Sequence, residues 1–313
     1  MTGETNEWDS YWRERGESAM DDAVRRDPGL ARLWEAFFAG APMEGAALDI
    51  ACGDGAVLRR GFARRGADLR YVGVDIAPDA LDRVRRDTPA EVVCARFEHL
   101  PFADGAFAAV VSQFGVEYGG GAAFVEAARL VGDGGRLLIV AHYSGGSIAR
   151  EASAKLEELD ALEAAPGFIP AAREFFAAVF AVERDGVAQR EGAARFQRAA
   201  DRFHKLLQTA ASLGAAAPDS LAARLCAGAK ALFDNRAGYA KEDVFGWLDA
   251  MQAAMESGRT RARALTDAAL DEEGARRVAS ALNGAGLTLS PPRSFTLEGR
   301  DVPAAWIFEA RHV

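Results

Sequence analysis

The sequence predicts an α/β protein: a mostly parallel sheet with an antiparallel C-terminal strand, flanked by helices and carrying a large all-helical insertion. Residues 1–146 alternate short apolar runs with amphipathic stretches, which is typical of βαβ units. Residues 147–266 are rich in alanine and show helical patterns without a strand-like run. Residues 267–313 return to strand-like segments. We therefore expect one α/β domain made of residues 1–146 and 267–313, with residues 147–266 inserted into it.

The first part of the chain contains five strand-like runs that are apolar on both faces, as a parallel sheet covered by helices on each side requires. These runs are 47–52, 70–76, 91–97, 108–114 and 136–143, with a turn expected at "VGDGG" before the last of them. Helices are expected near 55–66, 78–86 and 121–131, and a further one at 30–40 on the edge of the sheet.

The C-terminal part is expected to form a helix over 271–284 followed by two or three strands in "GLTLS", "RSFTL" and "AAWIFEARHV". In the insertion, breaks at "APGFIP", "AAAPDS" and "DNRAGY" predict four or five helices. One of them has an apolar stripe at spacings of three and four, formed by Phe196, Ala200, Phe203, Leu206, Leu207 and Ala210. Such an insertion can serve as a lid, a substrate wall or the surface of a homodimer.

Composition narrows the classes of partner. A formal net charge of −9 argues against a protein that holds nucleic acid by neutralising phosphates, and favours small-molecule or protein partners. The three cysteines lack metal-ligand spacing, so we expect no metal site and a reducing compartment. The N-terminus has no apolar core behind a basic start, and we find no run of 18 apolar residues, so we expect a cytoplasmic protein without a membrane span.

The stretch "ALDIACGDGAV" (47–57) reads as a strand that enters a glycine-bracketed turn. In open parallel sheets, ligands bind at the carboxyl ends of the strands. Gly53 and Gly55 let the backbone approach a ligand closely, and the following helix offers its first N–H groups. Asp75 ends the next strand 22 residues after Gly53, the spacing at which a carboxylate can bond both ribose hydroxyls. Together these features predict a nucleoside site.

Two classes of cofactor use such a site. A dinucleotide site has a third glycine, but Leu58 stands at that position. A pyrophosphate would also lie close to the carboxylates of Asp49 and Asp54. A ligand that carries an ammonium or sulfonium group would be attracted by those same carboxylates.

These residues resemble the class I S-adenosylmethionine-dependent methyltransferases, whose glycine motif has the form seen here as "LDIACGDG". The resemblance extends to "YVGVDIAPDAL", "ARFEHLPFADGAFAAVVSQFGVEY" and "VGDGGRLLIVAHY", and "WDSYW" is like the N-terminal aromatic segment of many members. It covers roughly residues 30–146 and the C-terminal strands, and leaves out the insertion. It implies a Rossmann-like fold with S-adenosylmethionine as cofactor and S-adenosylhomocysteine as product.

The resemblance also implies roles by position. The methionine end would be lined by Asp49, Gly53 and Gly55, with Ala51 and Asp54 in the same loop. Asp75 would take the ribose, Ile76 would pack on the adenine, and backbone groups near Phe97 and Glu98 would read its edge. Ser112, Gln113 and Phe114 would stand below the methyl group. Aromatic rings such as Tyr11, Trp12 or Phe114 can stabilise a sulfonium by cation–π contact.

Methyl transfer from a sulfonium is an in-line displacement, in which the protein mainly aligns the reacting atoms. A base is needed only when the acceptor arrives protonated. The first candidate base is His142, followed by Glu117, Tyr118 and Tyr143 in the loops after the fourth and fifth strands. The acceptor, most simply a small molecule, can present an oxygen, nitrogen or carbon nucleophile. Two alternatives stay open: a regulatory protein that binds the cofactor without transfer, and a dinucleotide oxidoreductase.

Overall fold

A computed structural model of the chain separates into two compact units, which are described in turn. One unit comprises residues 1–151 and 264–313, and the other comprises residues 152–263. The structure describes Trp8, Tyr11, Trp12, Val24 and residues 26–40, 44–97, 99–183 and 189–312, with the backbone alone at 189–192 and 216.

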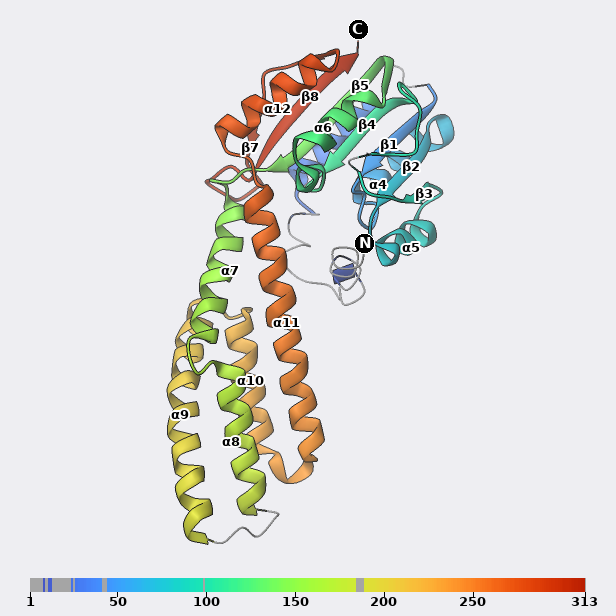
Figure 1. The fold of residues 1–313 in the computed structure, drawn as a ribbon. Coiled ribbons are helices and arrows are strands. Elements are labelled where there is room, and N and C mark those ends of the chain that lie inside the picture. The colour runs from blue at the N-terminus through green and yellow to red at the C-terminus, as the bar shows by residue number, and fades with distance from the viewer. Residues whose placement is uncertain are drawn as a thin grey trace. The chain divides into compact units, whose positions relative to one another are not determined.

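The first unit is built on an eight-stranded sheet within the described residues (Figure 1). Its strands are β1 (Ala46–Ile50), β2 (Arg70–Asp75), β3 (Glu91–Cys94), β4 (Phe107–Gln113), β5 (Val131–His142), β6 (Leu287–Leu289), β7 (Arg293–Phe295) and β8 (Ala305–His312). They lie in the order β3-β2-β1-β4-β5-β8-β6, with β7 also paired to β8. The first five strands pair in parallel, and β8 runs antiparallel to β5. The predicted fold class is confirmed.

Helices cover both faces of this sheet. One face packs on α3 (Pro28–Ala39), α4 (Ala56–Arg65) and α5 (Pro78–Asp87), and the other on α6 (Gly120–Arg129) and α12 (Glu272–Gly284). Figure 1 shows α6 and α12 side by side on their face. Successive strand residues alternate between the two cores, so each central strand is apolar on both sides, as the sequence predicts. Short 3-10 turns lie at η1 (Gly66–Asp68) and η2 (Val116–Gly119).

The helix expected on the sheet edge lies on a face instead, so that placement was wrong. Trp34, Phe37 and Phe38 of α3 share one core with strand residues from the middle of the sheet. Three aromatic rings bury more apolar area on the centre of a sheet than at its edge, where they would stay partly solvated.

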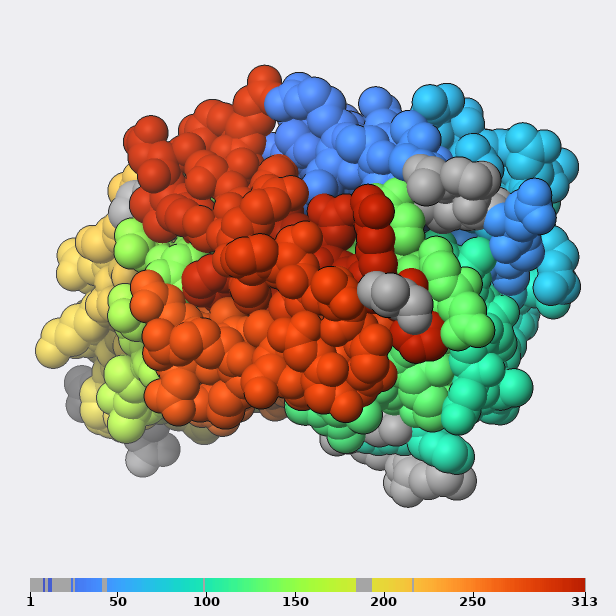
Figure 2. Space-filling view, turned by 90° about the horizontal axis from the view of Figure 1, so that it is seen from above, coloured from blue at the N-terminus to red at the C-terminus, as the bar shows by residue number. Residues whose placement is uncertain are grey.

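The buried Asp27 anchors α3 to the end of the chain. Its Oδ1 accepts the N–H of Leu30 at 2.7 Å and caps the helix, while Oδ2 accepts the N–H of Glu298 at 2.6 Å. Figure 2 shows the α3 region, in blue, beside the red C-terminal segment. One carboxylate therefore joins the two ends of the α/β unit.

The turn expected at "VGDGG" belongs to a strand. Pairing of β5 begins at Val131, which lies opposite Phe107, and the next paired residue is Arg136, opposite Ala109. Five residues on β5 thus advance against two on β4, and Gly134 turns with a φ of +68°. The glycines form an irregularity inside a continuous ladder rather than its end.

The second unit is helical. Its helices, of which the first and last extend beyond the unit's bounds, are α7 (Ser147–Glu163), α8 (Phe168–Glu183), α9 (Gln189–Ala216), α10 (Leu221–Asp234) and α11 (Lys241–Ala268), with a 3-10 turn η3 (Arg236–Gly238). They surround one apolar core, and all six residues of the stripe predicted on α9 contribute to it. Phe175 of α8 stacks on Phe203 of α9 with ring centres 5.1 Å apart.

One stretch, Ser147–Glu183, is long and apolar enough to cross a membrane by length and composition alone. It is not a continuous helix, because residues 164–167 separate α7 from α8. Of its most apolar window, 56% is buried inside the protein. Phe168, Phe176 and Phe180 fill the core of the helical unit, so the hydropathy of this stretch reflects packing.

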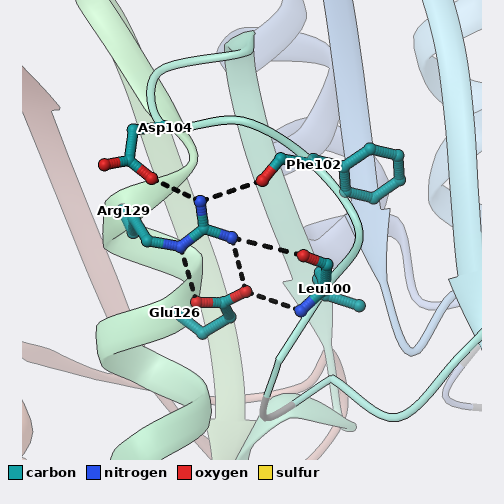
Figure 3. A network of polar contacts seen from close by, with 5 residues as sticks. All are labelled: Leu100, Phe102, Asp104, Glu126 and Arg129. Carbon is teal, nitrogen blue, oxygen red and sulfur yellow. Dashed lines mark hydrogen bonds and ion pairs between the residues drawn. The ribbon is translucent and has the colours of Figure 1, made fainter.

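A compact polar network holds the loop after β3 against α6 (Figure 3). Glu126 Oε1 accepts the N–H of Leu100 at 2.6 Å and also accepts Arg129 Nη2 at 2.7 Å. Arg129 Nη1 donates to the carbonyl of Phe102 at 2.9 Å and to Asp104 Oδ1 at 2.5 Å. The hydrogen bond from Arg129 lowers the pKa of the Glu126 carboxyl. An ion pair on one helix thus satisfies the backbone of a loop that lacks regular structure.

We expect Glu126→Gln to lower the free energy of unfolding at pH 7 by roughly 1.5–3 kcal/mol, the usual contribution of hydrogen bonds to charged groups. Because the folded pKa of Glu126 is lowered, its stabilisation is complete above the ordinary value of 4.5 and is lost as pH falls through the folded value. In urea titrations the variant and the unaltered chain should therefore converge at acid pH.

The matched control is Asp104→Asn, which removes the partner of Arg129 that is 84% exposed. It should cost less than about 1 kcal/mol, as exposed ion pairs do. Equal losses in both variants would contradict the assignment of the network to Glu126.

Candidate active site

The carboxyl ends of β1, β2, β4 and β5 meet at one edge of the sheet, because these strands are parallel. The chain passes from β1 to β2 on one side and later returns to place β4 on the other, so the strand order reverses beside β1. Open α/β sheets bind ligands at such a position. Most predicted site residues lie at the ends of these four strands or in the loops that leave them.

The glycine turn after β1 adopts left-handed backbone conformations. Gly53 has a φ of +52° and Gly55 a φ of +82°, and Gly55 caps the N-terminus of α4. A Cβ at Gly53 would lie 2.6 Å from the ring of Trp12. The missing side chain at Gly53 therefore accommodates Trp12, a constraint that the sequence pattern did not reveal.

Asp49 is buried in β1, with 1% of its surface exposed. Neither carboxylate oxygen has a hydrogen-bond partner in the described part of the chain. Burial, reinforced by the nearby charges of Asp75 and Asp54, raises the pKa of the Asp49 carboxyl well above its ordinary value. A buried carboxylate without a partner costs free energy, and a cation at this edge would offset that cost.

Asp75, at the end of β2, joins two loops. Its Oδ2 accepts the N–H of Gly53 at 2.8 Å, and its Oδ1 accepts the N–H of Ala77 at 2.9 Å. Burial raises the pKa of this carboxyl, although the backbone hydrogen bonds oppose the rise. Each oxygen keeps a lone pair for a further donor, as a ribose hydroxyl would be. Ile76, which follows, is half-buried.

Two residues without the freedom of glycine adopt left-handed backbone at the exits of neighbouring strands. Ala51 after β1 and Phe114 after β4 both have a φ of +55°. A Cβ at Gly115 would lie 2.3 Å from that of Ala51, so the two exits are in contact. Strain of this kind gathers at functional sites. Gly115 was not among the predicted site residues, and its single glycine in "FGVEY" was the only sequence signal.

Other predicted cofactor residues have structural partners. Ser112 is fully buried, where its hydroxyl donates to the carbonyl of Ile50 at 2.8 Å. Gln113 Oε1 accepts Trp34 Nε1 at 2.6 Å, so its side chain is engaged by α3. Phe97 is half-buried against Gly119, where a Cβ would come within 2.7 Å of its ring. Glu98 lies outside the described residues.

His142 and Glu117 form a buried pair at the ends of β5 and β4. Glu117 lies in η2, and its Oε1 is 2.7 Å from His142 Nδ1. The same oxygen accepts the backbone N–H of His142 at 2.9 Å. The imidazole lies 4.5 Å from the ring of Phe114, tilted by 31°, and Tyr118 approaches it edge-on. Two of the predicted catalytic residues are therefore in direct contact.

The N-terminal aromatic residues reach the same edge. Trp8 contacts Tyr118 with ring centres 5.2 Å apart, and Tyr11 contacts Trp12 at 5.1 Å. Trp12 packs with Ala77 and Ala80, and its carbonyl accepts a hydrogen bond from Arg83. Tyr143, the remaining catalytic candidate, places its ring against Trp306 of β8, with the centres 5.2 Å apart.

Among the described residues, no group of three His, Cys, Asp or Glu side chains could hold a metal ion.

Comparison with known proteins adds a family assignment for part of the chain. Residues 48–139 match a family model described as a methyltransferase domain. Among curated proteins, none matches the chain.

Solved structures similar to the chain include a Haloferax volcanii complex of the Trm112 methyltransferase activator (22% identity, 44% of this chain and 60% of that chain, TM-score 0.36). A second is the YcgJ protein of Bacillus subtilis, with 22% identity, coverage of 41% of this chain and 57% of that chain, and a TM-score of 0.34. A third is a geranyl diphosphate methyltransferase in complex with GPP and sinefungin, with 20% identity, coverage of 36% of this chain and 44% of that chain, and a TM-score of 0.33. The chain thus spans at most three fifths of the length of these proteins.

The matched segment runs from Leu48 in β1 to Ile139 in β5 and contains the glycine turn, Asp75 and Glu117. The methyltransferase resemblance stated from the sequence motifs is therefore confirmed for this part of the chain: residues 48–139 match a methyltransferase domain.

Proposed function

We propose that the protein is an S-adenosylmethionine-dependent methyltransferase that moves a methyl group to an oxygen, nitrogen or carbon nucleophile of a small molecule. The observation that carries this proposal is Asp49, a carboxylate buried without a partner beside the glycine turn. A ligand with an ammonium and a sulfonium group supplies the positive charge that Asp49 lacks. A pyrophosphate would add negative charge to a place that already holds Asp54 and Asp75.

The residues present fit this cofactor. Asp49 and the turn at Gly53–Gly55 would hold the methionine end, and Asp75 would accept the ribose hydroxyls with the lone pairs left by its two backbone hydrogen bonds. Ile76 and Phe97, both half-buried, offer apolar surface for the adenine. Phe114, Tyr11 and Trp12 offer aromatic faces for a cation.

When bound, the cofactor supplies a methyl group that its sulfonium already activates. The protein's own contribution is to bind and align the reactants, since in-line transfer depends on orientation. The rigid strand exits at Ala51 and Phe114, fixed by their mutual contact through Gly115, suit that task. His142 is available as a base where the acceptor carries a proton.

We also retain the cytoplasmic location and the absence of nucleic-acid and membrane partners as expectations from composition. The insertion, placed at residues 147–266, is proposed to recognise the acceptor or to form a homodimer. Its core is filled by its own side chains, which supports an independently packed element.

Isothermal titration calorimetry tests cofactor binding. We expect S-adenosylhomocysteine to bind, and Asp75→Ala or Asp49→Asn to weaken binding by at least about tenfold, because a lost charged contact costs roughly 1.5–3 kcal/mol. Asp82→Asn is the matched control, since Asp82 is 63% exposed and pairs with a surface arginine in the same helix. Binding of NAD in place of S-adenosylhomocysteine would overturn the proposal.

A second measurement separates the enzyme from a protein that binds the cofactor without transfer. The purified chain is incubated with labelled S-adenosylmethionine and a broad small-molecule extract. Incorporation of label into any acceptor supports the proposal. Tight binding without any transfer would identify a regulatory protein instead.

Asp49 should also reduce the stability of the unliganded protein. Because its folded pKa is raised above the ordinary 3.8, the folded state binds the extra proton, and stability falls as pH rises through the folded value. We expect Asp49→Asn to be more stable than the unaltered chain at pH 8, by about 1.4 kcal/mol for each unit of the rise. The difference should shrink below pH 4 in thermal melts; a variant less stable at every pH would contradict this account.

A further inference from the structure

The pairing of His142 with Glu117 determines which imidazole nitrogen is free. Glu117 Oε1 accepts the backbone N–H of His142 at 2.9 Å, and the same oxygen lies 2.7 Å from Nδ1. A carboxylate accepts hydrogen bonds, so the proton of the neutral ring lies on Nδ1. The backbone and ring of one residue thus donate to a single oxygen, which fixes the side chain to its own strand end. Nε2 has no hydrogen-bond partner within the described residues.

The surroundings of the pair leave little room for rearrangement. Glu117 is 3% exposed and His142 is 5% exposed. Phe114 lies along one side of the imidazole, and the edge of Tyr118 meets it from another direction. Glu117 Oε2 is buried without a partner in the described structure, a cost that the fold bears at this position. The buried carboxylate of Glu117 lies beside His142 at the edge that the cofactor residues share. Such a carboxylate stabilises the imidazole when the ring takes up a second proton.

We propose that Glu117 is a positioning residue that holds His142 with Nε2 as a general base, and that the methyl acceptor is accordingly a hydroxyl compound. This inference rests on the proposed methyltransferase function. A carboxylate, or an aromatic amine that is neutral at pH 7, already presents a lone pair, so a dedicated base would add nothing to its methylation. A phenol or alcohol keeps its proton at neutral pH and needs a base as the new bond forms.

The transfer balances as follows in bonds and charges. The hydroxyl proton passes to His142 Nε2 while the acceptor oxygen forms its bond to the methyl carbon. The bond between that carbon and sulfur breaks, and its electron pair stays on sulfur. The products are a methyl ether, a neutral thioether and an imidazolium held by Glu117, which then returns its proton to solvent.

The ring state is tested without cofactor or acceptor. In the full-length protein labelled with ¹⁵N-histidine, long-range ¹H–¹⁵N spectra should show one imidazole protonated on Nδ1, and its assignment follows from its absence in His142→Gln. In Glu117→Gln this pattern should change to a mixture or to the Nε2 form, because an amide no longer demands a donor. A ring protonated on Nε2 in the unaltered chain would overturn the proposal.

The acceptor class is tested with labelled S-adenosylmethionine and a panel of small phenols and alcohols, matched by aromatic amines and carboxylates. We expect methylation of hydroxyl compounds to fall by roughly 10²- to 10⁴-fold in His142→Gln. It should fall by at least about tenfold in Glu117→Gln, as when a catalytic histidine loses the partner that sets its tautomer. Partial recovery is expected in Glu117→Asp, which restores the acceptor. Methylation confined to amines or carboxylates, no methylation of any hydroxyl compound, or full rates in both variants would overturn it.

Two controls keep the outcomes apart. His204→Gln, on the exposed side of α9, should lose only its own imidazole signal and should keep the His142 signal and the transfer rates of the unaltered chain. Both dyad variants should bind S-adenosylhomocysteine as tightly as the unaltered chain, because neither side chain is assigned to the cofactor. If no form of the protein binds it, the methyltransferase function fails, and the ring state remains readable by NMR. If binding is intact and only the transfer pattern is wrong, the dyad assignment fails alone.

Discussion

The carboxylate of Asp75 accepts one backbone N–H from the turn after β1 and another from the start of α5. These two hydrogen bonds fix the glycine turn relative to the exit of the neighbouring strand, at the place where the sheet order reverses. Trp12 packs against Gly53 of this glycine turn, and the ring of Tyr11 contacts that of Trp12. The geometry of this strand edge therefore depends on Asp75, whose carboxylate already holds two backbone N–H groups without any ligand.

Several local costs meet at this edge, which also holds both of the left-handed residues other than glycine among the described residues. Asp49 is buried without a partner, Ala51 and Phe114 hold left-handed backbone, and one oxygen of Glu117 is unsatisfied. The well-packed cores on both faces of the sheet can support such costs. Natural sequences break local rules mainly at functional positions. The distribution of strain thus points to the same edge as the family motif, from independent observations.

The positions of the main strands along the chain and their mostly parallel direction could be predicted, because apolar runs and glycine turns are local features of the sequence. The placement of α3 could not, since its aromatic residues define an apolar face but not the surface that receives it. The glycines of "VGDGG" allow both a turn and an irregular strand. The pairing of β5 with β4, Val131 with Phe107 and Arg136 with Ala109, decides between them. The contact of Gln113 Oε1 with Trp34, 79 positions earlier, could not be predicted either, because no local pattern relates the two residues.

The candidate site likewise has one part that the sequence predicts and one part that it does not. Its cofactor part is readable because backbone geometry demands glycine and a carboxylate at set spacings, which a motif records. Its chemical part depends on Glu117 and His142, which lie 25 residues apart on different strand exits. No local pattern relates them, and the sequence could rank them only as separate candidates. Glu117 Oε1 lies 2.7 Å from His142 Nδ1 and 2.9 Å from the backbone nitrogen of His142. These contacts join the two separate candidates in one arrangement, in which the ring proton lies on Nδ1. Under the proposed function, recognition of the acceptor depends on a contact between side chains, whereas recognition of the cofactor depends on the course of the backbone.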